Sequence, residues 1–177
     1  MADPRMARER LLRRMVREAK KTPAPEGEHW LEQYACAVLT GRITACRKVR
    51  LLCAVLLDKI RRPEKYKPWV FDMEQANVHI AFVEKFCKQP QGRLGAPLEL
   101  QLFQKARWQA IFGFVDRDTG LRQYQEVMIV EGRKNGKTTE CAAIEIDLLV
   151  NDGEGAPEIY SIATKREQAA KSDNACV

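Results

Sequence analysis

Hydrophobic positions recur every three or four residues through the first part of the chain, and this period predicts α-helices. Asp3 followed by Pro4 predicts the start of the first helix, because aspartate caps helix N-termini and proline suits the first helical position. Residues 22–27 contain two prolines and a glycine, which end that helix. Its apolar face is formed by Leu11, Leu12, Met15, Val16 and Ala19.

Three further helices are predicted before residue 88. The first covers 30–39 and stops at Gly41, the second is ended by Pro63, and the third is capped by Asp72. The apolar series of the second is Ile43, Cys46, Val49, Cys53, Leu56 and Ile60. The apolar series of the third is Met73, Ala76, Ile80, Val83 and Phe86.

The pattern changes after residues 88–97, which hold two prolines and two glycines. We therefore expect a helical, basic region over 1–95 and a second domain over 96–177. In the second we expect helices over 100–112, 138–150 and 164–175, a tight turn at 118–120, and strands over 127–130 and 158–163. A buried strand, a loop, a helix and another strand form an α/β unit with a parallel sheet. The predicted fold class is thus α/β, an incomplete parallel-sheet core preceded by a helical region.

Composition and charge limit the classes of protein to which the chain can belong. With 45% hydrophobic residues the chain is too apolar for a disordered tail, and its six cysteines form no Cys-x-x-Cys pair, which favours a reducing, intracellular setting. No apolar run is long enough to span a membrane. Residues 1–62 carry a net charge of +8 and the remainder −2. This asymmetry favours a polyanion or an acidic partner, although a solvated helix face explains it equally well.

The candidate chemistry lies at residues 131–139, Glu-Gly-Arg-Lys-Asn-Gly-Lys-Thr-Thr. A strand, a glycine-containing loop and a helix N-terminus together bind phosphate through backbone N–H groups and the helix dipole. Lys137 would reach the β- and γ-phosphates, and the hydroxyl of Thr138 would ligate Mg²⁺. The standard phosphate loop (P-loop, Walker A) has glycine five positions before Gly136, whereas this chain has Glu131. A lysine- and asparagine-rich surface turn is the alternative.

The form of this loop resembles that of the large terminase subunits of tailed bacteriophages, which are ATPase motors that package DNA into proheads. The matching core is Arg-Lys-Asn-Gly-Lys-Thr over 133–138. Residues 100–105 followed by Ile-Phe-Gly-Phe at 111–114 are similar to the adenine-recognition segment of that family. Residues 118–122 resemble its turn before the phosphate-loop strand, and 163–169 resemble its segment after the second strand. Weaker similarity extends upstream to residue 30.

The resemblance implies roles for individual residues. Gln104 would pair with the adenine edge, which its amide donor and acceptor match, and Phe103 would support the ring or belong to the core. Arg133 would act as an arginine finger in cis, or else as a surface or capping arginine. The loop residues expected at the nucleotide are Arg133, Lys134, Asn135, Gly136, Lys137, Thr138 and Thr139. Thr164 and Gln168 follow the second predicted strand, where they would have a coupling role, or Thr164 would cap a helix.

An ATPase of this kind also needs a strand that ends in Asp-Glu, and the 177 residues contain no such pair. Asp147 falls inside the helix after the loop, and neither His29 nor His79 has a metal-ligand spacing. We expect an incomplete terminase, without the acidic strand and the nuclease, that binds ATP weakly and does not hydrolyse it.

The implied partners and setting follow from the family. They are ATP and Mg²⁺, double-stranded DNA, the small terminase subunit and the portal of the prohead, within a homo-oligomeric ring in the host cytoplasm and with no membrane. The alternatives are a non-enzymatic, basic helical nucleic-acid-binding or adaptor protein, and another P-loop ATPase such as a helicase. Gln104 and Arg133 fit the terminase pattern better than the helicase one.

Overall fold

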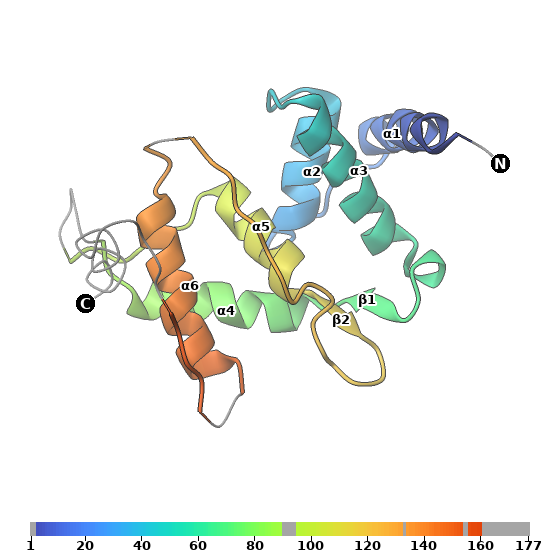
Figure 1. Cartoon of the computed structure of the whole chain (residues 1–177). Helices are drawn as coiled ribbons and strands as arrows, with labels where there is room; N and C mark the ends of the chain where they lie inside the picture. The colour runs from blue at the N-terminus through green and yellow to red at the C-terminus, as the bar shows by residue number, and fades with distance from the viewer. Residues whose placement is uncertain (1–2, 90–94, 133, 154–155, 161–177) are drawn as a thin grey trace. The chain divides into compact units, whose positions relative to one another are not determined.

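The computed structural model describes residues 3–89, 95–132, 134–153 and 156–160 (Figure 1). The described part is mostly helical, with one small antiparallel sheet. The chain forms two compact units: the first comprises residues 1–77 and 101–126, and the second comprises 78–100 and 127–177. Each unit is described on its own below. The predicted division of the chain at residue 95 stays a prediction.

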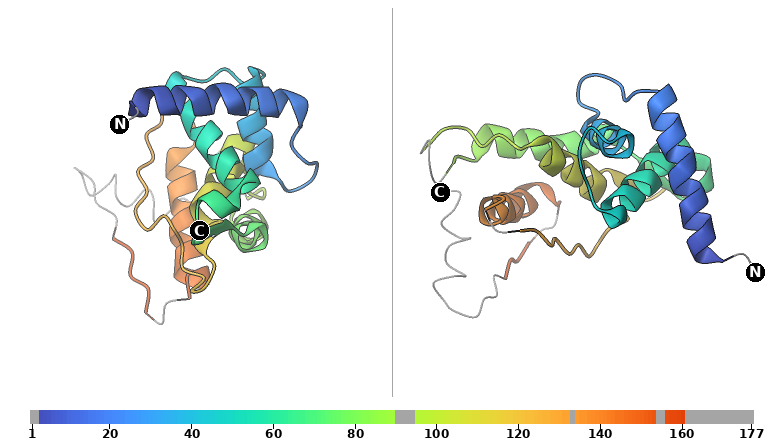
Figure 2. Two further views of the ribbon diagram at one scale, coloured as in Figure 1. Left: turned by 90° about the vertical axis from the view of Figure 1, so that its right-hand side faces the viewer. Right: turned by 90° about the horizontal axis from the view of Figure 1, so that it is seen from above.

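Three helices build most of the first unit. They are α1 (Pro4–Lys21), α2 (Trp30–Thr40) and α3 (Arg47–Arg61), and α1 lies against both of the others (Figure 2). The predicted start of α1 is confirmed, because the side chain of Asp3 accepts a hydrogen bond from the backbone N–H of Arg5 at 2.9 Å. Gly41 ends α2 in the left-handed conformation, with φ of 86°.

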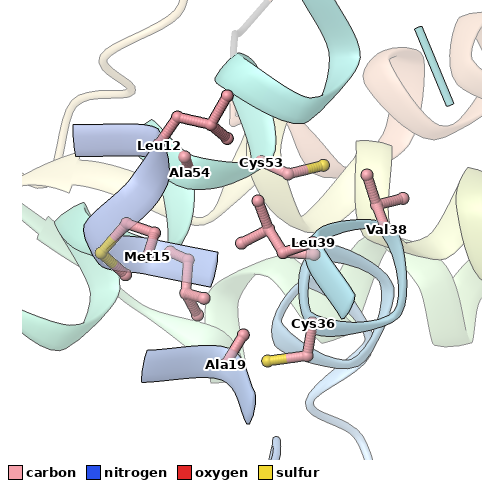
Figure 3. Packing of buried hydrophobic residues seen from close by; sticks show 10 residues of the cluster. Leu12, Met15, Ala19, Cys36, Val38, Leu39, Cys53 and Ala54 are labelled. Atoms are coloured by element: carbon pink, nitrogen blue, oxygen red, sulfur yellow. The ribbon is translucent and has the colours of Figure 1, made fainter. Parts of the chain in front are cut away.

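The apolar faces of these helices meet in one core (Figure 3). The predicted stripe of α1 is confirmed, since Leu12, Met15 and Ala19 are buried and Leu11 and Val16 are partly buried against them. The other buried members are Ala35, Cys36, Val38, Leu39, Cys53, Ala54 and Leu57. Burial of such side chains contributes about 25 cal/mol per Å² of apolar surface, which is what holds the basic α1 in place.

The third helix begins later than its apolar series predicts. Cys46 is extended and serves as the N-cap of α3, and Ile43 precedes the helix. The backbone N–H of Ile43 donates to the carbonyl of Ala37 at 3.0 Å, so this residue completes the end of α2. Its side chain still packs on the core.

A two-stranded antiparallel sheet lies beyond a short 3-10 helix, η1 (Pro63–Lys65). Strand β1 (Trp69–Phe71) pairs with β2 (Phe114–Asp116), with Val70 opposite Val115. Between β2 and the helix that precedes it, α5 (Leu102–Phe112), only Gly113 intervenes. The predicted turn at 118–120 is confirmed, with the N–H of Gly120 bonded to the carbonyl of Asp116 at 2.9 Å.

The second unit contains the last residues of α4 (Met73–Phe86) and all of α6 (Lys137–Asn151). Asp72 caps α4 as predicted, because its Oδ1 accepts from the N–H of Gln75 at 2.9 Å. Ala76, Ile80 and Val83 are buried, whereas Phe86 is 58% exposed, so its predicted place in the apolar stripe is wrong. Phe86 is the last residue of α4, and Cys87, which follows the helix, is the buried residue instead.

The predicted strand at 127–130 is wrong. These residues form no strand; Ile129 is half-buried and the other three are exposed, with Met128 at 89% and Val130 at 85%. A strand exists only through its hydrogen-bonded neighbours, and the described part of the chain supplies none here. Of the second predicted strand, 158–160 are not strand, and 161–163 lie outside the described residues together with the predicted helix at 164–175. The parallel sheet is therefore absent from the described residues.

Candidate nucleotide-binding site

Residues 134–136 turn sharply into α6. Gly136 is the N-cap of that helix and has φ of 78°, in the left-handed region that glycine enters without strain. Lys134 has φ of 67°, which costs a residue with a Cβ about 1 kcal/mol. Left-handed residues within a turn direct successive backbone N–H groups into a common concavity, a geometry that binds anions. The two left-handed residues at 134 and 136 are of the kind that occurs in such anion-binding turns.

Lys137 closes this loop. Its side chain extends from the first turn of α6, and Nζ donates to the carbonyl oxygen of Glu131 at 3.0 Å. The ammonium group therefore lies over the loop that precedes its own helix rather than pointing into solvent. Because a carbonyl is a weak partner for a charge, a phosphate oxygen can replace it at little cost. No sequence signal indicates the Glu131 contact, since it uses the backbone.

The helix N-terminus behind the loop favours an anion. Gly136 has no side chain to cap the first N–H groups of α6, and the dipole of a 15-residue helix places partial positive charge there. Thr138 is exposed in this first turn, as are Lys134 and Asn135 in the loop, and Thr139 is half-buried. Arg133 lies outside the described residues.

The body of α6 is anchored within the second unit. Ala142 and Ala143 are buried, and Asp147 is fully buried. Nδ1 of His79 lies 2.7 Å from Oδ2 of Asp147, and Asn151 donates to Oδ1 at 2.8 Å. Both carboxylate oxygens of Asp147 thus have partners within the second unit. This agrees with the interpretation that Asp147 is a residue of the helix and not a ligand at the phosphate loop. His79 is itself buried, at 5% exposed.

The residues expected at the adenine lie in the first unit, on α5. The amide oxygen of Gln104 accepts from the backbone N–H of Gln101 at 2.9 Å, one half of a capping box at the start of that helix. Phe103 is half-buried, with the guanidinium of Arg107 5.5 Å from its ring centroid. Trp108 is completely buried, as a core residue should be. The roles of Gln104 and Phe103 at a nucleotide stay predictions.

A Mg²⁺ ion that accompanies a nucleotide needs few protein ligands, because phosphate oxygens and water complete its octahedron. The exposed hydroxyl of Thr138 is suited to supply one. Among the described residues no group of three or more His, Cys, Asp or Glu side chains is arranged to hold a metal by itself. In the same part of the chain, no helix has the length and apolar character needed to cross a membrane.

Comparison with known proteins extends these observations. Residues 102–174 match the family model described as the terminase large subunit, ATPase domain. The terminase large subunit of Enterobacteria phage HK97 is 39% identical over 93 residues, which are 51% of this chain and 17% of that protein. The chain thus spans about a sixth of the length of this relative. No solved structure gives a significant match.

The matched range begins with α5 and runs through the loop and α6, so it includes Phe103, Gln104 and the residues from Lys134 to Thr139. The resemblance based on these segments is confirmed. Over residues 102–174 this chain is similar to the ATPase domain of terminase large subunits.

Proposed function

We propose that the chain is the nucleotide-binding part of a large terminase subunit, a motor that couples ATP hydrolysis to the translocation of double-stranded DNA. The observation that carries the proposal is the position of the Lys137 ammonium, 3.0 Å from the Glu131 carbonyl and over a loop that turns through Gly136 into α6. A positive charge fixed at a helix N-terminus is the feature that a triphosphate requires.

In this proposal Lys137 moves from the carbonyl to the β- and γ-phosphates, while backbone N–H groups of the loop hold the remaining oxygens. Thr138 ligates Mg²⁺, which screens the phosphate charge when it is bound. Arg133 stabilises the charge that develops on the transferred phosphoryl group. Gln104 pairs with adenine. To do so, its amide oxygen gives up the hydrogen bond from the N–H of Gln101 and accepts one from the adenine amino group instead.

The partners of the whole motor belong to the proposal as well. They are the small terminase subunit, the portal of the prohead and further copies of the large subunit in a ring, in the cytoplasm of the bacterial host. Because the chain spans only 17% of its HK97 relative, these interactions rest on the family and not on residues described here.

We expect the 177-residue chain by itself to bind ATP weakly and not to turn it over. Activation of water needs a carboxylate near the γ-phosphate. Within α6, Asp147 is engaged with His79 and Asn151, and Glu140 is buried at 2% exposed. Phosphate release that exceeds the buffer rate and is abolished by Lys137→Ala would contradict this expectation.

The proposal is tested by titrating a fluorescent ATP analogue with Mg²⁺ into the chain and into variants. Lys137→Ala should weaken binding at least tenfold, because it removes the charge that faces the phosphates. Thr138→Ala should weaken binding with Mg²⁺ present and leave the metal-free affinity unchanged. Lys85→Ala removes one exposed charge from α4 and serves as the matched control. Equal affinities for Lys137→Ala and the unaltered chain would refute the nucleotide site.

The second candidate function is a non-enzymatic nucleic-acid-binding or adaptor protein. It is favoured by the outward-facing cations of α1, of which Arg13 is 74% exposed at its side chain. This alternative predicts no specific binding of ATP, and so the same titration decides between the two.

A further inference from the structure

A row of cations covers the outer face of α1. The buried stripe of this helix consists of Leu12, Met15 and Ala19. At 100° per residue, five cations fall within about 100° of arc on the opposite side. All five are exposed, and we call them the basic stripe: Arg10, Arg13, Arg17, Lys20 and Lys21.

The two acids of α1 do not neutralise this stripe. Glu9 accepts from Arg47 of α3 at 3.0 Å, and Glu18 accepts from Arg62 at 2.5 Å. Both acids therefore serve the packing of α1 against the α3 side of the unit. Arg13 also approaches Glu9, at 3.8 Å, but an exposed pair of this length contributes less than about 1 kcal/mol. The stripe keeps most of its positive field.

The chemistry of the stripe matches a duplex phosphate backbone. From Arg10 to Lys21 it spans about 17 Å of helix axis, which faces about five phosphates of each strand. Helix α1 has no aromatic residue, so it offers no surface on which unpaired bases stack. It also has no Asn or Gln, the side chains that pair with adenine edges. Lysine and arginine contact phosphate oxygens without regard to sequence, and such contacts are the most frequent kind between proteins and DNA.

A membrane surface fits less well. Amphipathic helices bind membranes by inserting their apolar face, and the apolar face of α1 is already buried against α2 and α3 (Figures 2 and 3). We therefore propose that the basic stripe of α1 binds the phosphate backbone of duplex DNA, independently of its sequence. That the duplex is DNA and not RNA rests on the proposed motor function.

The test measures fluorescence anisotropy of a labelled 20-base-pair duplex with the full chain over a range of salt concentrations. The variant Arg10→Gln/Arg13→Gln/Arg17→Gln keeps good helix formers on an exposed face, and circular dichroism checks that it folds. It should bind at least tenfold more weakly at low salt. The slope of log K against log salt should fall in magnitude by about 2.7, which is 0.9 for each lost phosphate contact.

The matched control removes the same charge elsewhere, in Lys65→Gln/Lys67→Gln/Lys88→Gln, where all three side chains are exposed. It should bind the duplex within twofold of the unaltered chain. Equal weakening in both triple variants would overturn the proposal, because binding would then depend on net charge alone. Tighter binding of a single strand, or equal competition by polyglutamate of the same charge, would also overturn it.

The two proposals fail separately in these experiments. Lys137→Ala should bind the duplex normally, and the basic-stripe variant should bind the ATP analogue normally. If the chain does not bind ATP but binds the duplex through the basic stripe, the proposed motor function is refuted and the proposed DNA-binding surface stands. If the chain binds ATP normally but its duplex binding does not depend on the basic stripe, the proposed surface is refuted and the motor function stands.

Discussion

Nδ1 of His79 lies 2.7 Å from Oδ2 of Asp147, and both side chains are buried. The contact joins α4 to α6, the helix whose first turn carries Lys137 and Thr138. Asn151 bonds the other carboxylate oxygen of Asp147, so the acid has hydrogen-bond partners on both oxygens. A buried carboxylate is tolerated only with such partners. This pair therefore fixes the helix that follows the candidate phosphate loop.

We expect His79→Ala to destabilise α6 by about 3 kcal/mol, because it removes a partner from a buried carboxylate. Hydrogen exchange of the backbone amides of α6 measures the effect. The double variant His79→Ala/Asp147→Ala should cost less than the sum of the two single variants, since no acid is then stranded. Additive losses in the double variant would show that the two side chains are not coupled.

The second prediction concerns Gly113, between α5 and β2. A Cβ at this position would lie 2.6 Å from the carbonyl oxygen of Gln109 and 2.6 Å from Cε2 of Phe71. Both are too close for any real contact, so the backbone has to shift. Gly113→Ala should therefore lower the free energy of unfolding of the first unit by about 1–3 kcal/mol.

Urea unfolding followed by tryptophan fluorescence reports on that unit, because Trp30, Trp69 and Trp108 all belong to it. Gly132→Ala is the control for stability, since its Cβ would meet only the amide nitrogen of Asn135 at 3.6 Å, an ordinary contact. A Gly113→Ala variant as stable as Gly132→Ala would mean that the junction is looser than described.

Helix ends could be predicted wherever a single residue determines them. Asp3, Gly41 and Asp72 act locally, through a side-chain oxygen or a left-handed φ, and their positions are confirmed. Strands could not be predicted in this way. Residues 127–130 have suitable side chains but no pairing neighbour among the described residues, whereas β1 is a three-residue strand after Pro68 that exists because β2 lies beside it.

The candidate site likewise has features that the sequence predicts and features that it does not predict. The order of loop and helix around Gly136 and Lys137 follows from local sequence, and the structure describes the corresponding turn and helix. The capping box that engages Gln104 was not predicted, because glutamine is an unusual N-cap. The spacing between Gln101 and Gln104 does fit that motif. The pairing of His79 with Asp147 joins residues 68 apart and leaves no local signal.

The third prediction concerns acid stability and Asp58, whose side chain is 3% exposed. Burial raises the pKa of this carboxyl, whereas hydrogen bonds from Tyr66 and Arg62 lower it. The charges of Arg14 and Arg62 lower it as well, and together these interactions outweigh burial, so the pKa lies below its ordinary value.

Because this pKa is depressed in the folded chain, Asp58 stabilises the fold above its unfolded pKa of about 3.9. That contribution is lost as the pH falls through the folded pKa. Asp58→Asn should lower the urea midpoint at pH 7 and flatten its decline below about pH 4. Parallel curves for the variant and the unaltered chain, measured by tryptophan fluorescence, would assign the acid sensitivity to other carboxylates.

The last prediction concerns thiol reactivity. Cys46 is exposed at the N-cap of α3, and the nearby backbone N–H groups of Val49 and Lys48 in the first turn lower its pKa. Burial raises the pKa of Cys53 to about 12, and burial also raises that of Cys36. Since the thiolate is the reactive form, iodoacetamide at pH 7 should label Cys46 well before either of the others. The pH of half-maximal labelling at Cys46 should lie below that of the same residue in urea, where the three rates should converge. Peptide mass spectrometry measures all three sites in one experiment, and labelling of Cys53 as fast as Cys46 in the folded chain would contradict the described core.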